Sequence, residues 1–257
     1  MGAKTMATNF ATTDLLQNNI AARRARLSFE HRFFLTVAVL FPLITFIGFA
    51  PSYYLKTVLV SRPIPSTLVH VHGLVMSLWI ILFSVQAYLI SSKRIKLHMT
   101  LGMSSIALVL VMLVTGMMTA VAAGARGGGF PGYPPLVFMN VPIVGLFVFA
   151  VLFGAALYYR KNAANHKRLM LVTVVVFLSP SISRLPLPFI PLLGSTWFFG
   201  VPALIGFALL IGDTYRTGKL NRVFLYGVLF GTITGPLGLL FARTDAWMQF
   251  ANWIIGS

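Results

Sequence analysis

Long apolar runs alternate along this chain with short polar stretches in which basic residues gather. A helix needs about 20 mainly apolar residues to cross the hydrocarbon core of a bilayer. The segments that satisfy this requirement are residues 33–50, 66–90, 99–123, 136–159, 168–185, 197–212 and 223–241. The fifth and sixth are short and flank a proline-rich stretch at 180–191, so five or six spans would remain if one of them is re-entrant. The pattern predicts an all-α, polytopic transmembrane helical bundle of about seven spans.

The basic residues test this number of spans independently, because the cytoplasmic loops of membrane proteins carry an excess of Lys and Arg. With seven crossings, fifteen of the 20 Lys and Arg residues fall on the side of the N-terminus. The five on the other side are Lys56, Arg62, Arg126, Arg184 and Arg243. The sequence therefore predicts a cytoplasmic N-terminus and a C-terminus outside.

Composition agrees with a surface covered by lipid. Hydrophobic residues make up 58% of the 257 residues and charged residues only 9%, whereas soluble domains carry about 25% charged residues. The net charge of +16 is spread over clusters between apolar runs and does not form one face, which excludes a nucleic-acid-binding protein. With no Cys, the chain has neither disulfides nor thiolate metal sites. About thirty mostly polar residues precede the first span, so we expect no cleavable signal peptide.

These boundaries divide the chain into three parts. Residues 1–32 form a basic cytoplasmic tail, residues 33–243 form the bundle, and residues 244–257 form a tail on the outer side. The last part places Trp247, Phe250 and Trp253 near helical spacing, which predicts a short amphipathic helix lying in the membrane interface.

Ionisable side chains inside spans are costly and are therefore candidates for function. His70, His72 and Arg184 lie near the predicted outer side, and His98 and His166 near the inner side. Neutral imidazole is a ligand for haem iron, copper and zinc. His70 and His72 point about 200° apart on a helix, so at most one of them ligates a given metal. The alternative is that one histidine bonds a neighbouring helix while the other faces the headgroups.

Leu185 precedes Pro186, and a residue before proline is pushed away from helical geometry. Arg184 therefore marks the end of the fifth helix. No acidic side chain lies in any predicted span. The partner of Arg184 is therefore backbone carbonyls, Asp245, a lipid phosphate or an anionic ligand such as a haem propionate. The alternative is that its side chain snorkels to the headgroups. We place His72 and Arg184 together at a haem or metal site, with His72 favoured over His70.

Three further patterns limit the classes of function. Without carboxylates in the spans, an acid-driven antiporter is not expected. The last span has no Lys, which excludes a retinal Schiff base. That span does carry Gly227, Gly231 and Gly235 at four-residue intervals, a groove that lets another helix approach closely, either within the chain or from a partner.

Several motifs together resemble uncharacterised bacterial polytopic membrane proteins of the domain-of-unknown-function kind. The motifs are GFAPSYYL at 48–55, HVHGLVMSLWIILFSVQ at 70–86, LHMTLG at 97–102 and NHKRLML at 165–171. This resemblance implies a histidine-bearing helical bundle in the bacterial inner membrane. More distantly, the chain is similar to two-haem transmembrane b-type cytochromes, which implies that His98 and His166 form one ligand pair.

The leading hypothesis is a redox-associated membrane protein whose span histidines hold haem b or copper, for electron transfer or for cofactor assembly of an oxidase. A second hypothesis is a cofactor-free accessory subunit of a larger membrane complex, or a homo-oligomer, joined through the glycine groove of the last span. A third is a transporter of a small molecule or lipid, because broken helices such as the one at 180–191 commonly line transport sites.

Overall fold

The computed structural model describes residues 29–30, 32–59, 66–129 and 132–256, and within these ranges the regular structure is entirely helical. The first span, Arg32–Tyr54, ends in a π-helical turn, η1 (Ala50–Tyr54). The later elements are α2 (Lys56–Leu59), α3 (Thr67–Ser91), α4 (Ile95–Ala125), α5 (Pro135–Tyr158), η2 (Tyr159–Lys161), α6 (Ala163–Ile182), α7 (Ile190–Thr217), α8 (Arg222–Phe241) and α9 (Asp245–Ile255).

Six helices of the described chain are long and apolar enough to cross a membrane, as in a multi-pass membrane protein. They are the first span, α3, α4, α5 with η2, α7 and α8. The prediction of seven spans is not confirmed, because α6 does not reach that standard. Its first two turns contain Asn165, His166, Lys167 and Arg168, which leaves too short an apolar remainder.

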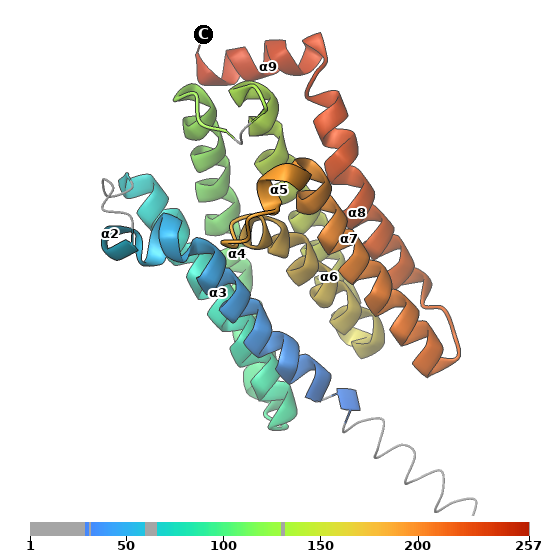
Figure 1. The fold of residues 1–257 in the computed structure, drawn as a ribbon. Coiled ribbons are helices and arrows are strands. Elements are labelled where there is room, and N and C mark those ends of the chain that lie inside the picture. Colours follow the sequence, from blue (N-terminus) through green and yellow to red (C-terminus); the bar gives the residue numbers. More distant parts are fainter. Residues whose placement is uncertain (1–28, 31, 60–65, 130–131, 257) are drawn as a thin grey trace, which may run out of the picture.

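Although it is the least apolar of the long helices, α6 lies at the centre of the bundle. It packs against α5, α7 and α8, while α4 links α3 to α5 (Figure 1). The core includes Trp79 of α3, whose ring meets Phe149 and Phe153 of α5 edge-on at 5.2 and 5.5 Å. Helix α9 lies across the ends of α4 and α5 (Figure 1). Its Trp247 Nε1 donates to the carbonyl of Leu136 at 2.9 Å.

The first span joins this core through close backbone contact. Gly48 lies directly on the carbonyl of Ser181 near the end of α6, where any side chain would overlap it. The Ser181 hydroxyl donates to Thr45 Oγ1 at 3.2 Å. Further along, Ser84 of α3 donates to the carbonyl of Ala38 at 2.6 Å. A glycine and small hydroxyl side chains thus set the position of this span against α3 and α6.

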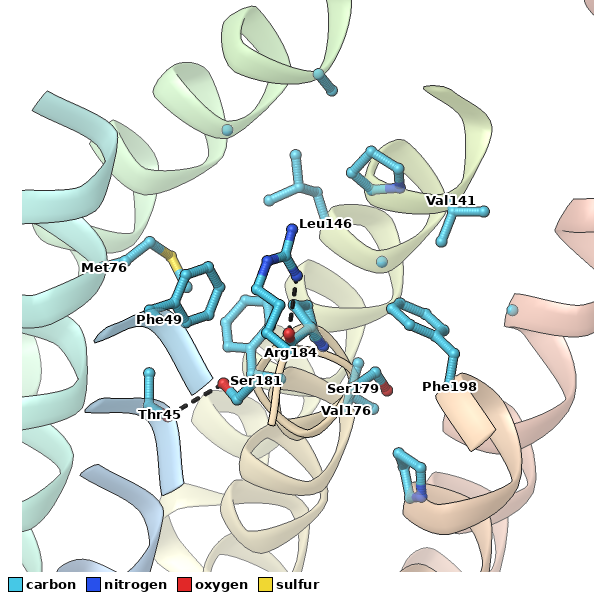
Figure 2. A pocket seen from close by; sticks show the side chains of 18 of the residues that line it. Thr45, Phe49, Met76, Val141, Leu146, Val176, Ser179, Ser181, Arg184 and Phe198 are labelled. Atoms are coloured by element: carbon cyan, nitrogen blue, oxygen red, sulfur yellow. Dashed lines mark hydrogen bonds between the residues drawn. The ribbon is translucent and has the colours of Figure 1, made fainter. Parts of the chain in front are cut away.

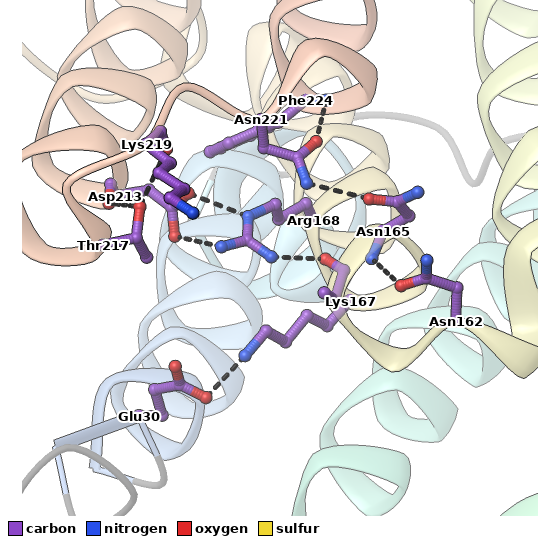
Figure 3. A network of polar contacts seen from close by, with 11 residues as sticks. Glu30, Asn162, Asn165, Lys167, Arg168, Asp213, Thr217, Lys219, Asn221 and Phe224 are labelled. Atoms are coloured by element: carbon purple, nitrogen blue, oxygen red, sulfur yellow. Dashed lines mark hydrogen bonds and ion pairs between the residues drawn. The ribbon is translucent and has the colours of Figure 1, made fainter. Parts of the chain in front are cut away.

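A polar network joins the first turns of α6, the last turns of α7 and the start of α8 (Figure 3). Arg168 Nε and Nη2 both donate to the Asp213 carboxylate at 2.8 Å, and Nη1 donates to the carbonyl of Ala164 at 2.7 Å. Asn221 Nδ2 donates to Asn165 Oδ1 at 2.8 Å. The expectation that no span carries an acidic side chain is wrong, because α7 continues past residue 212 and includes Asp213.

The glycine groove of α8 packs within the chain. A side chain at Gly227 would meet Leu169 of α6 at 3.0 Å, and one at Gly231 would meet Val176 of α6 at 3.1 Å. At Gly235 the neighbour is Phe199 of α7, at 2.7 Å from the position of a Cβ atom. The groove is therefore filled by α6 and α7 of the same chain.

Candidate functional site

A cavity of about 490 Å³ lies inside the bundle beside the connection between α6 and α7 (Figure 2). The first span and helices α3 to α8 all contribute to its wall. Most of the wall is apolar, with Phe49 and Met76 on one side and Val141, Leu146 and Phe198 on others. A volume of this size is in the range of small-molecule sites, about 300–1,000 Å³.

The end of α6 directs Arg184 into this cavity (Figure 2). Helix α6 ends at Ile182, and Trp197 of α7 fixes that end by donating from Nε1 to the Ile182 carbonyl at 3.1 Å. Arg184 Nη1 donates to the carbonyl of Pro180 at 2.8 Å. Its guanidinium also lies over the ring of Phe49, at 4.8 Å from the ring centroid. The side chain is accessible because it faces the cavity.

No carboxylate of the described residues pairs with Arg184. Asp213 bonds Arg168 and Glu30 bonds Lys167, both in the network at the other end of α6. Asp245 lies in the first turn of α9. Since a guanidinium has five N–H donors and the described contacts of Arg184 use one, several donors remain for a ligand. The hydroxyls of Thr45, Ser179 and Ser181 line the same cavity.

His72 lines this cavity from α3. Its Nδ1 lies 3.2 Å from Thr115 Oγ1, and that hydroxyl donates to the carbonyl of Val111 at 2.8 Å. Because the threonine proton is already used, Nδ1 of His72 is the donor and Nε2 carries the lone pair. Metal-binding histidines commonly have this arrangement, in which a second-shell oxygen fixes the tautomer.

His70 lies outside the cavity wall. Its ring is exposed and rests against Tyr53, with ring centroids 5.8 Å apart, and its carbonyl accepts from the Tyr53 hydroxyl at 3.2 Å. The structure thus brings His72 and Arg184 to one cavity and leaves His70 out of it.

The two histidines that the sequence predicts near the inner side, His98 and His166, lie close to each other. The rings of His98 and His166 lie 6.3 Å apart between centroids, on the first turns of α4 and α6. Neither residue lines the cavity. Within the described residues no group of three or more His, Cys, Asp or Glu side chains is placed to hold a metal ion. The fifth histidine of the chain, His31, precedes the first predicted span and lies outside the described residues.

Sequence reasoning missed the wall contributed by the first span, above all Phe49 and Thr45. Both are ordinary residues of a transmembrane helix, and only the neighbouring Gly48 gave a signal that a close helix contact occurs there. Comparisons with protein-family models, with curated proteins and with solved structures found no match to this chain.

Proposed function

We propose that the protein is a multi-pass membrane protein that binds an amphipathic organic anion in the cavity beside Arg184. The observation that carries this proposal is a cation without a described carboxylate partner, facing a cavity with mainly apolar walls. The apolar wall would take the hydrocarbon body of the ligand. The guanidinium would take its anionic head.

The energetics favour a ligand of this charge. The side chain of Arg184 is exposed to the cavity, so protein atoms leave several of its N–H donors uncovered. The carbonyl of Pro180 and the ring of Phe49 compensate Arg184 only in part. A carboxylate or phosphate can accept two parallel N–H bonds from a guanidinium, which are about twice as strong as bonds between neutral groups.

The test is to compare binding of oleate with binding of oleyl alcohol, which has the same chain without the charge, to the full-length protein in detergent. Each hydrogen bond to a charged group contributes about 1.5–3 kcal/mol. Arg184→Gln should therefore weaken oleate binding about 10–100-fold and change the binding of oleyl alcohol little, with Arg184→Lys in between.

The matched control is Arg126→Gln, which removes an exposed arginine that does not line the cavity. This variant should bind oleate as the wild type does. Equal affinities of the wild type for oleate and oleyl alcohol would contradict the proposal. So would an equal loss of oleate affinity in Arg184→Gln and Arg126→Gln.

Haem b is a second candidate, favoured by the tautomer of His72. Haem is itself an amphipathic anion, and when bound it supplies a redox-active iron. His72 Nε2 would hold the iron and Arg184 would pair with a propionate. A redox role, in electron transfer or in oxidase assembly, depends on this binding. The Soret band of added haemin should then shift on binding to the wild type and to His70→Ala but not on addition to His72→Ala. The same shift in His72→Ala as in the wild type would exclude this ligand.

Transport of the same anion is a further extension of the proposal. Helix α7 is broken at Gly194, which has φ 49° and ψ −123°, close to the connection that carries Arg184. Broken helices next to a binding site are a common feature of transporters. We do not extend the accessory-subunit hypothesis, because α6 and α7 already fill the groove of α8.

We also infer that α6 crosses the membrane surrounded by α5, α7 and α8. The protein then has seven crossings, and we place its N-terminus in the cytoplasm of a bacterium, with the bundle in the inner membrane. Three connections rich in Lys and Arg, which join α3 to α4, α5 to α6 and α7 to α8, lie at the same end of the bundle (Figure 1). This arrangement supports the orientation that the positive-inside rule predicts.

A further inference from the structure

The cavity beside Arg184 extends along both sides of the last turns of α6 (Figure 2). Phe177 and Ser181 line it on one side of this helix, and Val175 and Ser179 line it on the other. Residues two positions apart on a helix point about 200° apart, so these two pairs face opposite sides. The cavity therefore has two arms, which α6 separates and which meet beyond the end of this helix, at Arg184.

The first arm lies between α6, the first span and α3. Ser181 donates to Thr45 Oγ1 across this arm at 3.2 Å, and Phe49 and Met76 line it on the same side of α6 (Figure 2). Along the first span the wall continues from Phe49, beside the guanidinium, to Phe41, which is about 12 Å at the helical rise of about 1.5 Å per residue. An extended chain advances about 1.2 Å per bond, so this arm covers about ten carbon atoms.

The second arm lies between α6, α5 and α7. Val176 and Phe198 line it beside Val141, on the side of α6 away from the first span (Figure 2). Along α5 the wall runs from Val141 to Val148, which is about 10 Å at the helical rise and covers about eight carbon atoms. Gly145 lies between these two valines on the same stripe of α5, and a Cβ atom added there would meet no atom within 4 Å. The second arm is therefore open at Gly145.

The polar groups of the cavity divide it into one head site and two chain sites. Arg184 is the only Lys or Arg that lines it among the residues that the structure describes, and it lies where the arms join. Within the arms, Thr45 accepts the bond from Ser181, and the Thr232 hydroxyl donates to the carbonyl of Val228 at 2.8 Å. A ligand with one chain would fill one arm only, and the walls of the other would lack the dispersion contacts that a chain provides.

We propose that the ligand of the anion site is a lipid with one phosphate head and two hydrocarbon chains, one chain on each side of α6. The assignment rests on the proposed anion site at Arg184 and adds the second chain. The phosphate accepts parallel N–H bonds from the guanidinium. Each arm covers about the first eight to ten carbon atoms of its chain.

The test compares two phosphate lipids that differ only in the number of chains, dioctanoyl phosphatidic acid and octanoyl lysophosphatidic acid. Binding to the full-length protein in detergent is expressed per mole fraction of lipid in the micelles, so that partition into detergent cancels. The wild type should bind the two-chain lipid at least about 10-fold more tightly, because linked chains fill both arms in one binding event.

Gly145→Leu places a side chain in the second arm and should remove this advantage. We expect it to weaken binding of the two-chain lipid at least about 10-fold and to leave binding of the one-chain lipid unchanged. Gly154→Leu is the matched control, because Gly154 is an exposed glycine of the same helix, has open space around it and does not line the cavity. This variant should keep the preference of the wild type.

A two-chain lipid with a photoreactive group on each chain keeps the proposal testable if Gly145→Leu does not fold. Labels are expected in both arms of the wild type, on Phe41 and on Phe198. Labels in one arm only, or equal affinities of the wild type for the two lipids, would overturn the second chain. If Arg184→Gln still weakened both lipids in that case, the anion site itself would stand. Binding of both lipids without any dependence on Arg184 would overturn the anion site and the two-chain assignment together.

Discussion

The ion pair between Arg168 and Asp213 should be the polar contact whose loss costs the bundle most. Arg168 projects from α6 and Asp213 from α7, and two hydrogen bonds of 2.8 Å join them. Asp213→Ala removes the carboxylate and leaves the guanidinium with the carbonyl of Ala164 alone among its described partners.

Burial sets the magnitude of this effect. The side chain of Arg168 is only 8% exposed and that of Asp213 20%. Removing one partner of a buried pair costs about 3–5 kcal/mol, because the other charge remains buried without compensation. At about 2–4 °C per kcal/mol for a chain of this size, the melting temperature should fall by about 10 °C.

Thermal unfolding in detergent, followed by intrinsic tryptophan fluorescence, measures this loss. Lys167→Ala is the control, because it breaks a pair with Glu30 whose side chains are 30% and 22% exposed, and such pairs contribute about 0–1 kcal/mol. Arg168→Leu combined with Asp213→Leu should recover much of the stability, since no charge is left unpaired. Equal losses in Asp213→Ala and Lys167→Ala would refute the reasoning.

Three further outcomes follow from packing and topology. Gly231→Leu should lower stability by about 1–3 kcal/mol through overpacking against α6. Gly154→Ala, at an exposed helix position with open space, should be neutral or stabilising by up to about 1 kcal/mol. Equal melting temperatures of the two variants would contradict the packing of α8 against α6. Trp247→Phe should cost about 1 kcal/mol and loosen α9, measured as faster hydrogen exchange of that helix; unchanged exchange would show that the indole bond does not hold it. A reporter fused after Lys96 should be cytoplasmic and one inserted at 127–129 periplasmic, and both on one side would overturn the assigned topology.

Hydropathy alone located six of the helices, because a spanning helix must be apolar over about 20 residues whatever its neighbours are. The start of α7 was the largest error in a boundary. The sixth span was expected to begin at Trp197, after a proline-rich stretch at 180–191, yet α7 begins at Ile190. Pro191 occupies the first turn of this helix, where proline fits without loss of a hydrogen bond. Gly194 then absorbs the kink with a positive φ.

The site could be predicted only residue by residue. Ionisable side chains are costly in a membrane span, and this singled out His72 and Arg184. That both lie at one cavity depends on how α3 and α6 pack, which no local pattern encodes. The pair of Arg168 and Asp213 escaped detection because each was assigned to the edge of a span. The available signal was that both residues lie at the predicted inner ends of consecutive predicted spans.

The most direct test of the central claim locates a bound amphipathic anion. Full-length protein is irradiated with an oleate analogue that carries a photoreactive group in mid-chain, and the labelled residues are identified by mass spectrometry. The account predicts labels on the cavity residues Phe49, Leu146 and Phe198, which excess oleate and Arg184→Gln both suppress. Labels confined to exposed residues of the outer surface such as Leu204, and unaffected by Arg184→Gln, would contradict it.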